Sequence, residues 1–197
     1  MEKGWKQMND YEIALFKDKQ MGFFIYLGVE AIMFATLFAT YFIFTPAVKG
    51  PHPSDIFEWK SLLLSSFFLL SSSGTLILAE KGFTQGDKRK FLIGLGLTFI
   101  FALVFLGLEF SEFYRYVQEG YGISANIFLS AFYVLVGLHA AHVLFGACWM
   151  IVLFILYKKK TSTALYTEKL KIFSYYWHFV DVIWIFIIVL VYVPYLM

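Results

Sequence analysis

Five long apolar segments dominate this sequence and decide what it can fold into. They cover residues 21–44, 59–80, 90–113, 126–157 and 172–196. A helix needs about 20 apolar residues to cross the hydrocarbon core of a bilayer, and each segment approaches or exceeds that length. The alternation typical of membrane β-strands is absent from all five. The sequence therefore predicts an all-α integral membrane bundle of five transmembrane helices, with a polar segment at 1–20 and one domain over 21–197.

Composition agrees with a membrane protein and excludes several other classes. The chain has 197 residues, of which 60% are apolar and 15% charged. A soluble domain carries about 25% charged residues, so a disordered chain is excluded and a soluble enzyme is disfavoured. A formal net charge of +2 gives no indication of nucleic-acid binding. The single cysteine, Cys148, excludes an internal disulfide and any metal site built from several cysteines.

The distribution of lysine and arginine predicts the orientation. Thirteen of the 16 basic residues fall in the N-terminal segment and in the second and fourth connections, which share one side of the membrane. Three fall on the other side: Lys49, Lys60 and Arg115. Positively charged connections stay in the cytoplasm. We therefore expect a cytoplasmic N-terminus and an external C-terminus.

Glu30 is the single ionisable residue within the first apolar segment. It lies nine residues after Met21, a rise of about 14 Å. Two interpretations remain open: a protonated carboxyl that joins helices, or a group that handles protons. We expect Glu30 to face the bundle interior and to contact a polar group on the fourth or fifth helix. His142 is the preferred partner, and Asp181 lies at nearly the same depth.

Further polar residues occur in pairs within or near the spans. His139 and His142 are three residues apart, as are His178 and Asp181, so each pair shares a helix face. We expect these side chains to form a polar network with Glu30, and we expect no metal site because neither pair has a third ligand at useful spacing. At the end of the third span, Glu109, Glu112 and Arg115 are interpreted as ion pairs at the outer interface.

Several smaller patterns predict helix ends and packing. Asp55 with Glu58 has the spacing of a capping box before the second helix, and Asn126 is placed to cap the fourth. A cluster of serines with Gly74 in the second span predicts close helix packing, not a nucleophile: Ser65, Ser66, Ser71, Ser72 and Ser73.

These features alone leave two functional classes open. One is an accessory subunit of a larger membrane complex, and the other is an independent proton-coupled transporter with Glu30 and Asp181 as its relay. The absence of an internal repeat disfavours a transporter built from inverted repeats.

Four segments, in order along the chain, resemble subunit III of the haem-copper respiratory oxidases. The strongest resemblance is YYWHFVDVIWIF at 175–186, which is similar to the last helix of that subunit. The others are EAIMF at 30–34, LEFSEFY at 108–114 and FYVLVGLHAAHV at 132–143. Ala140 stands where the family has glycine between the paired histidines. The chain resembles the short five-helix bacterial form, which lacks the two N-terminal helices of the seven-helix form.

The resemblance implies a non-catalytic subunit of a proton-pumping oxidase that reduces O₂ to water in a bacterial cell membrane. It implies that haem and copper reside in partner subunits, with the catalytic chemistry in subunit I, and that this chain holds neither. It also implies contacts with subunit I, with other oxidase subunits and with membrane phospholipid. Stabilisation of the catalytic subunit and assistance to proton uptake are the implied roles. Cytochrome c and quinol both remain open as the electron donor.

Overall fold

The computed structural model describes residues 10–45, 59–159 and 163–196, and these ranges are almost entirely helical. Each of the five long helices is apolar enough over at least 18 residues to span a membrane, which confirms the predicted all-α, five-span architecture. After the fifth long helix the chain continues through a π-helical turn into a short last helix. The elements are α2 (Asp10–Ile43), α4 (Trp59–Gln85), α5 (Lys88–Gln118), α6 (Ile127–Lys158), α7 (Thr163–Ile187), η1 (Ile188–Tyr192) and α8 (Val193–Leu196).

Several helices extend beyond the apolar segments that predict them. Helix α2 begins at Asp10 instead of residue 21, and α7 begins at Thr163 instead of residue 172. Charged residues such as Lys and Glu are good helix formers, so a helix continues after its side chains leave the hydrocarbon. Asn126 caps α6 as predicted, because its Oδ1 accepts a hydrogen bond of 2.7 Å from the Leu129 N–H. The predicted capping pair Asp55 and Glu58 lies outside the described residues.

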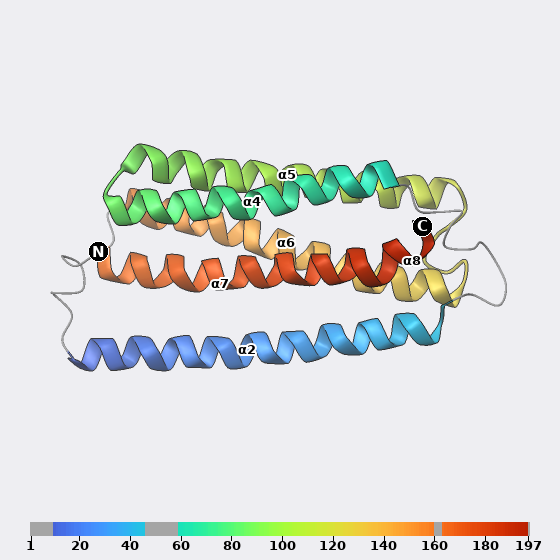
Figure 1. Ribbon diagram of the computed structural model, residues 1–197, viewed down its shortest axis with the longest axis horizontal. Coiled ribbons are helices and arrows are strands. Elements are labelled where there is room, and N and C mark those ends of the chain that lie inside the picture. The colour runs from blue at the N-terminus through green and yellow to red at the C-terminus, as the bar shows by residue number, and fades with distance from the viewer. Residues whose placement is uncertain (1–9, 46–58, 160–162, 197) are drawn as a thin grey trace.

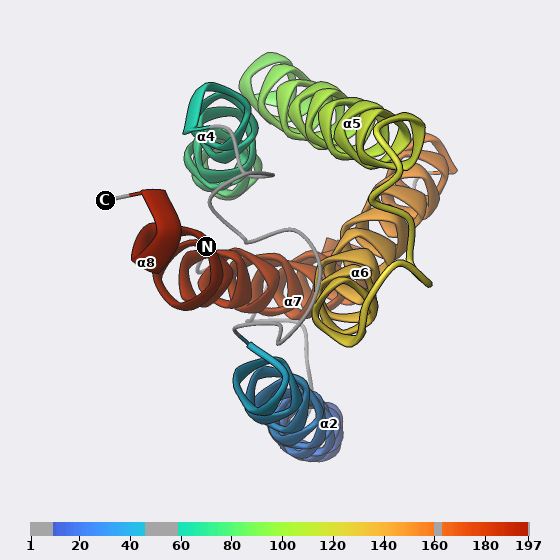
Figure 2. The same ribbon diagram turned by 90° about the vertical axis from the view of Figure 1, so that its right-hand side faces the viewer.

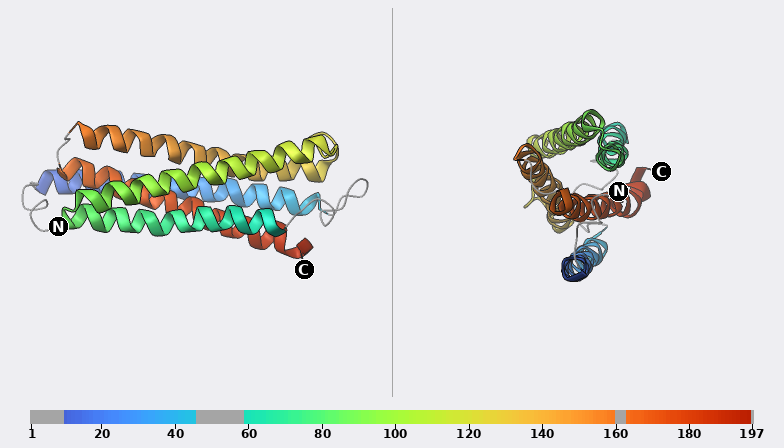
Figure 3. Two further views of the ribbon diagram at one scale, coloured as in Figure 1. Left: turned by 90° about the horizontal axis from the view of Figure 1, so that it is seen from above. Right: turned by 90° about the vertical axis from the view of Figure 1, so that its left-hand side faces the viewer.

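Helices α4, α5, α6 and α7 pack in that order around a common core, while α2 lies outside them (Figures 1 and 2). Helix α2 contacts α6 and α7, and the views along the bundle show it apart from α4 and α5 (Figures 2 and 3). Only 17% of its most apolar window is buried, compared with 50% for the span formed by α7 and its continuation. Helix α2 is therefore the helix least anchored by apolar packing.

Glycines allow the helices to approach closely at Gly82, Gly94 and Gly146. A Cβ on Gly94 of α5 would lie 2.7 Å from the backbone nitrogen of Ala79 on α4. A Cβ on Gly146 of α6 would lie 2.5 Å from the Trp177 ring of α7. Membrane helices associate largely through such van der Waals packing, because lipid is as apolar as their side chains.

A π-helical turn interrupts the regular α-helix before Pro194. Proline has no N–H to donate, and its ring clashes with the carbonyl one turn earlier, so it commonly distorts the preceding turn. Within this turn, the Val191 carbonyl accepts a bond of 3.4 Å from the Tyr41 hydroxyl on α2. The distorted segment thus contributes to holding α2 in place.

Basic residues gather at the end of the bundle where α2 and α7 begin and where α4 meets α5, on the left of Figure 1. We call this the lysine-rich end. The Asp87 carboxylate caps α5 there by accepting from the N–H groups of Arg89 and Lys90, both at 3.1 Å. The backbone N–H of Lys90, together with the Lys90 ammonium, lowers the pKa of Asp87. The described chain begins at this end, and α8 lies at the other.

Candidate functional site

Glu30 of α2 contacts His142 of α6, so the predicted contact is present in the structure. The distance from Glu30 Oε2 to His142 Nε2 is 3.2 Å, and the two side chains are only 16% and 13% exposed. The pair lies at the seam between α2 and α6 and not in the centre of the four-helix core. The Phe34 ring packs 5.2 Å from the His142 ring and adds an apolar wall.

The second nitrogen of His142 restricts the protonation states of this pair. His142 Nδ1 lies 2.8 Å from the Leu138 carbonyl, which can only accept, so Nδ1 carries a hydrogen. Nε2 then accepts from a protonated Glu30 or, when protonated itself, donates to the Glu30 carboxylate. Both arrangements hold one proton between two side chains and have no net charge, which suits a half-buried site. The pair can therefore move one proton over a short distance without changing its total charge.

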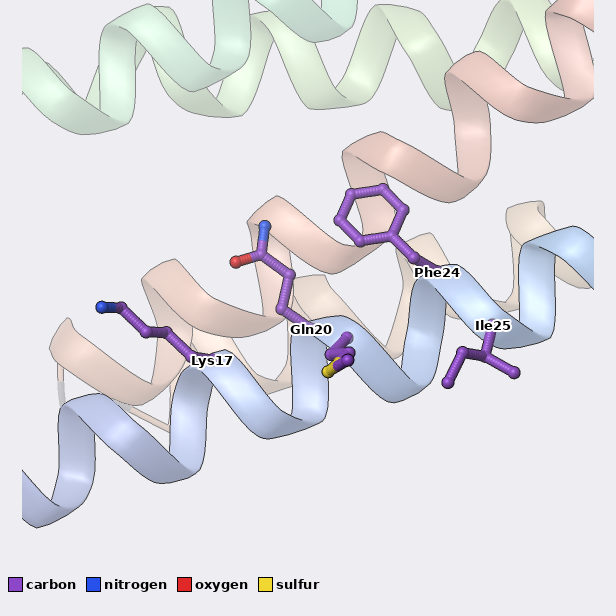
Figure 4. A pocket seen from close by; sticks show the side chains of 5 residues that line it. Lys17, Gln20, Phe24 and Ile25 are labelled. Atoms are coloured by element: carbon purple, nitrogen blue, oxygen red, sulfur yellow. The ribbon is translucent and has the colours of Figure 1, made fainter.

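Other polar contacts hold the rest of α2 near the lysine-rich end. Gln20 Nε2 donates to the Tyr175 hydroxyl over 2.9 Å, and Lys19 pairs with Glu168 at 3.3 Å. In Figure 4 the Gln20 side chain points from α2 toward α7, beside a shallow hollow on α2. Polar contacts thus contribute strongly to the attachment of a helix that buries little apolar surface.

A second polar cluster joins α4 to α7, with Asp181 buried and with Ser73 and His178 partly buried. Ser73 donates to the Asp181 carboxylate, and its oxygen lies 3.0 Å from His178 Nδ1. A hydroxyl has one hydrogen, so with Asp181 ionised the His178 Nδ1–H donates to Ser73. Asp181 is 5% exposed, and its Oδ1 has no hydrogen-bond partner among the described residues. The predicted pair His178 and Asp181 therefore does share one face, and Ser73 bridges it.

Serines of α4 have a role that the sequence did not reveal. Trp177 and Trp184 of α7 donate through their indole N–H groups to Ser72 and Ser66, at 2.9 and 3.1 Å. The sequence predicts these serines as small packing residues. They also accept hydrogen bonds between helices, which fixes the two largest side chains of α7 in the core.

The sequence predicts that His139 joins the polar network with Glu30, but in the structure it does not. Its ring is fully buried, stacks on Trp184 at 5.1 Å and meets the edge of Phe105 at 5.9 Å. Neither ring nitrogen has a hydrogen-bond partner within the described ranges. Residues three apart on a helix differ in direction by about 60°, so His142 reaches α2 while His139 points into the core.

Glu109 and Glu112 are buried within the bundle, which differs from the predicted ion pairs at the outer interface. They are 2% and 6% exposed. Glu112 accepts from Ser61 at 2.6 Å and from Tyr116, so hydroxyl groups solvate it. The Arg115 guanidinium lies 5.4 Å from the centre of the Tyr116 ring. Helix α5 continues to Gln118, so both carboxyls lie within the helix, on the face that packs against its neighbours.

No cluster of three or more His, Cys, Asp or Glu side chains suited to a metal occurs among residues 10–45, 59–159 and 163–196. The sites consist instead of carboxyl, imidazole and hydroxyl groups, which can hold or pass protons.

A family profile for cytochrome c oxidase subunit III matches residues 6–195. This chain belongs to that family. The four segments that carry the resemblance also supply the site: Glu30 from the first, Glu109 and Glu112 from the second, His139 and His142 from the third, and His178 and Asp181 from the fourth.

Relatives of this subunit III are named for different electron donors. The chain is 38% identical over 177 residues to "Cytochrome c oxidase subunit 3" of Bacillus sp. (strain PS3), covering 89% of this chain and 86% of the relative. It is 39% identical to "Quinol oxidase subunit 3" of Bacillus subtilis (strain 168), covering 87% and 85%. It is 38% identical to "Cytochrome bo(3) ubiquinol oxidase subunit 3" of Pseudomonas aeruginosa, covering 87% and 82%.

Together with the five spanning helices, these matches show a multi-pass protein of a bacterial cell membrane and part of a multi-subunit oxidase. They favour the oxidase-subunit interpretation over the independent transporter.

Proposed function

We propose that this chain is the non-catalytic subunit III of a proton-pumping haem-copper oxidase, where it stabilises the catalytic subunit and assists proton uptake. The observation that carries the proposal is the family match over residues 6–195. The carboxyl, imidazole and hydroxyl groups of the site are of the kinds that hold and pass protons. Haem and copper would be held by subunit I and other partner subunits, and membrane phospholipid would contact this chain.

The Glu30–His142 pair supports the assignment of proton handling. One proton is held between two side chains at 3.2 Å, at a seam that is partly open. The hydrogen bond from Nδ1 to the Leu138 carbonyl orients the imidazole so that Nε2 faces the Glu30 carboxyl. Glu30 lies near the middle of the span Phe16–Ile43, and His142 lies near the middle of α6, so a proton from the lysine-rich end would still have to cross about half of the bundle to reach the pair.

The electron donor is proposed as either cytochrome c or a quinol, since relatives of nearly equal identity carry both names. The donor site would lie on other subunits.

Purification of the tagged chain from its native membrane tests the proposal. We expect it to co-purify with a haem-containing chain, and the optical spectrum of the complex to show reduced-minus-oxidised haem bands. Oxygen consumption with reduced cytochrome c and with a quinol then identifies the donor. A chain that purifies in stable form without any haem-containing partner would support the independent transporter instead.

A further inference from the structure

A cavity opens at the lysine-rich end, away from both polar clusters. Its volume is about 600 Å³, and it is formed by the ends of α4, α5, α6 and α7. Binding pockets for small ligands commonly fall between about 300 and 1,000 Å³. Four helices contribute to its lining, so the cavity is part of the bundle itself.

Aromatic rings in mutual contact form one wall of this cavity. Phe83 packs 5.0 Å from Tyr166, and Phe91 packs 4.8 Å from Tyr157. Tyr157 and Tyr166 are 5.7 Å apart, and the Tyr166 hydroxyl donates to the Leu153 carbonyl at 3.2 Å. The wall is thus apolar and held in place by its own contacts, with the Tyr166 hydroxyl already in use.

Lys88 and Lys158 give the cavity its positive charge. Both side chains line the cavity, one from the start of α5 and one from the end of α6, and both residues are exposed. Asp87 also lines it, but its carboxylate caps α5 and lies 3.5 Å from the Lys90 ammonium. Asp87 offsets one of the two lysine charges in the lining, and the lining keeps an excess of positive charge that favours an anion.

The surroundings indicate what kind of anion fits. Leu92 lines the cavity and is 42% exposed, and the adjoining Ile93 is 51% exposed. On α6, Ile155 is 47% exposed. A basic opening with an aromatic wall, followed by apolar surface along two spans, matches a molecule with a charged head and acyl chains. A free phosphate would use the lysines and leave the apolar surfaces without a partner.

We propose that this cavity binds the headgroup of one anionic glycerophospholipid, with its phosphate between Lys88 and Lys158. Basic pockets between membrane helices on the cytoplasmic side are known to hold anionic lipid headgroups. The shallow hollow on α2 is different, because one helix lines it and Lys17 is its single lysine. The proposed site depends on the geometry of this chain alone and not on the electron donor.

Native mass spectrometry of the purified native complex tests this site. The complex is first delipidated and then titrated with dioleoylphosphatidylglycerol, dioleoylphosphatidylcholine or soluble glycerol 3-phosphate. We expect one phosphatidylglycerol to be retained at this site, with neither of the other two retained. Lys88→Gln combined with Lys158→Gln should weaken that retention about 30-fold, given the usual contribution of a lysine to anionic-lipid binding. The matched control is Lys81→Gln combined with Lys159→Gln, which removes two exposed lysines that do not line the cavity.

A second pair of variants leaves the charges in place. Leu92→Trp should obstruct the cavity and reduce retention, while Ile93→Trp, at a neighbouring exposed position outside the lining, should not. An equal loss of phosphatidylglycerol retention in the Lys88/Lys158 variant and in its Lys81/Lys159 control would overturn the proposal. Retention of phosphatidylcholine as strong as that of phosphatidylglycerol would also overturn it, as would equal binding of soluble glycerol 3-phosphate.

Discussion

At the scale of single residues, the contact between Glu30 and His142 joins α2 to α6. They combine a carboxyl and an imidazole at 3.2 Å with a fixed hydrogen on the opposite ring nitrogen. Both placements of the proton that this pair shares leave it without net charge, which suits its largely apolar surroundings.

A hydrophobic carbodiimide should modify Glu30 before the other carboxyls of this chain. The reagent needs a protonated carboxyl that it can reach from lipid, and the Glu30 side chain is 16% exposed at the α2–α6 seam. Glu109 and Asp181 are less accessible, at 2% and 5%. Peptide mass spectrometry after brief treatment measures the order of modification. Modification of Glu109 or Asp181 while Glu30 stays free would contradict this account.

The sequence predicts the contact between Glu30 and His142, but not the contacts of Ser73 or the burial of Glu109. The rise per residue places Glu30 about 14 Å and His142 about 22 Å from the ends of their apolar segments, so their contact is predicted only with a tilt or overhang of the long fourth helix. Helix periodicity places His178 beside Asp181. The part played by Ser73 is hidden, because a serine in a membrane helix can equally bond its own backbone, as Ser66 does to the Leu62 carbonyl. The burial of Glu109 depends on which helices surround α5, and no local pattern records that.

At the scale of elements, the close contact between α4 and α5 depends on Gly94. Gly94→Ala would bring a methyl group to 2.7 Å from the Ala79 backbone nitrogen, so the two helices must separate. We expect a cost of about 1–3 kcal/mol, seen as a lower thermal midpoint in detergent. Gly96→Ala is the matched control, since nothing lies within 4 Å of its added Cβ. If the two variants have the same thermal midpoint, the close packing at Gly94 is not important for stability.

The cap of α5 gives a pH-dependent prediction. Because the pKa of Asp87 is lowered in the folded state, its contribution to stability is present above the unfolded pKa and is lost as pH falls through the folded one. Asp87→Ala should lower the thermal midpoint at pH 7, whereas Asp87→Asn should largely keep it, because asparagine also caps helices. The difference in thermal midpoint between wild type and Asp87→Ala should become smaller below about pH 4. An advantage that stays constant down to pH 3 would show that the carboxylate is not responsible.

The helix ends show why element boundaries are harder to predict than the elements. Hydropathy finds the five hydrocarbon-spanning portions, since each is long and apolar. It does not find the start of α2 at Asp10, because polar residues continue the helix outside the membrane. The π-turn at Ile188–Tyr192 also lies within an apolar run, where Pro194 is the one local sign of distortion.

At the scale of the whole molecule, the lysine-rich end should face the cytoplasm. Single cysteines at Thr84 and Ser162 should react with an impermeant maleimide only after cells are permeabilised, while a cysteine at Ser124 should react in intact cells. The background should carry Cys148→Ala, because that cysteine is exposed. The reverse labelling pattern would mean that the bundle is inserted with the opposite orientation.

Oxygen reduction by a fully assembled complex that carries Glu30→Gln tests most directly whether this subunit is accessory. Glutamine keeps the size of the side chain and a hydrogen bond to His142, but it cannot release a proton. We predict normal assembly and most of the wild-type rate of oxygen consumption, with slower proton uptake or a shorter active life over many turnovers. Loss of oxygen reduction in an assembled complex with normal haem content would contradict the account, because Glu30 would then belong to the site of the chemistry.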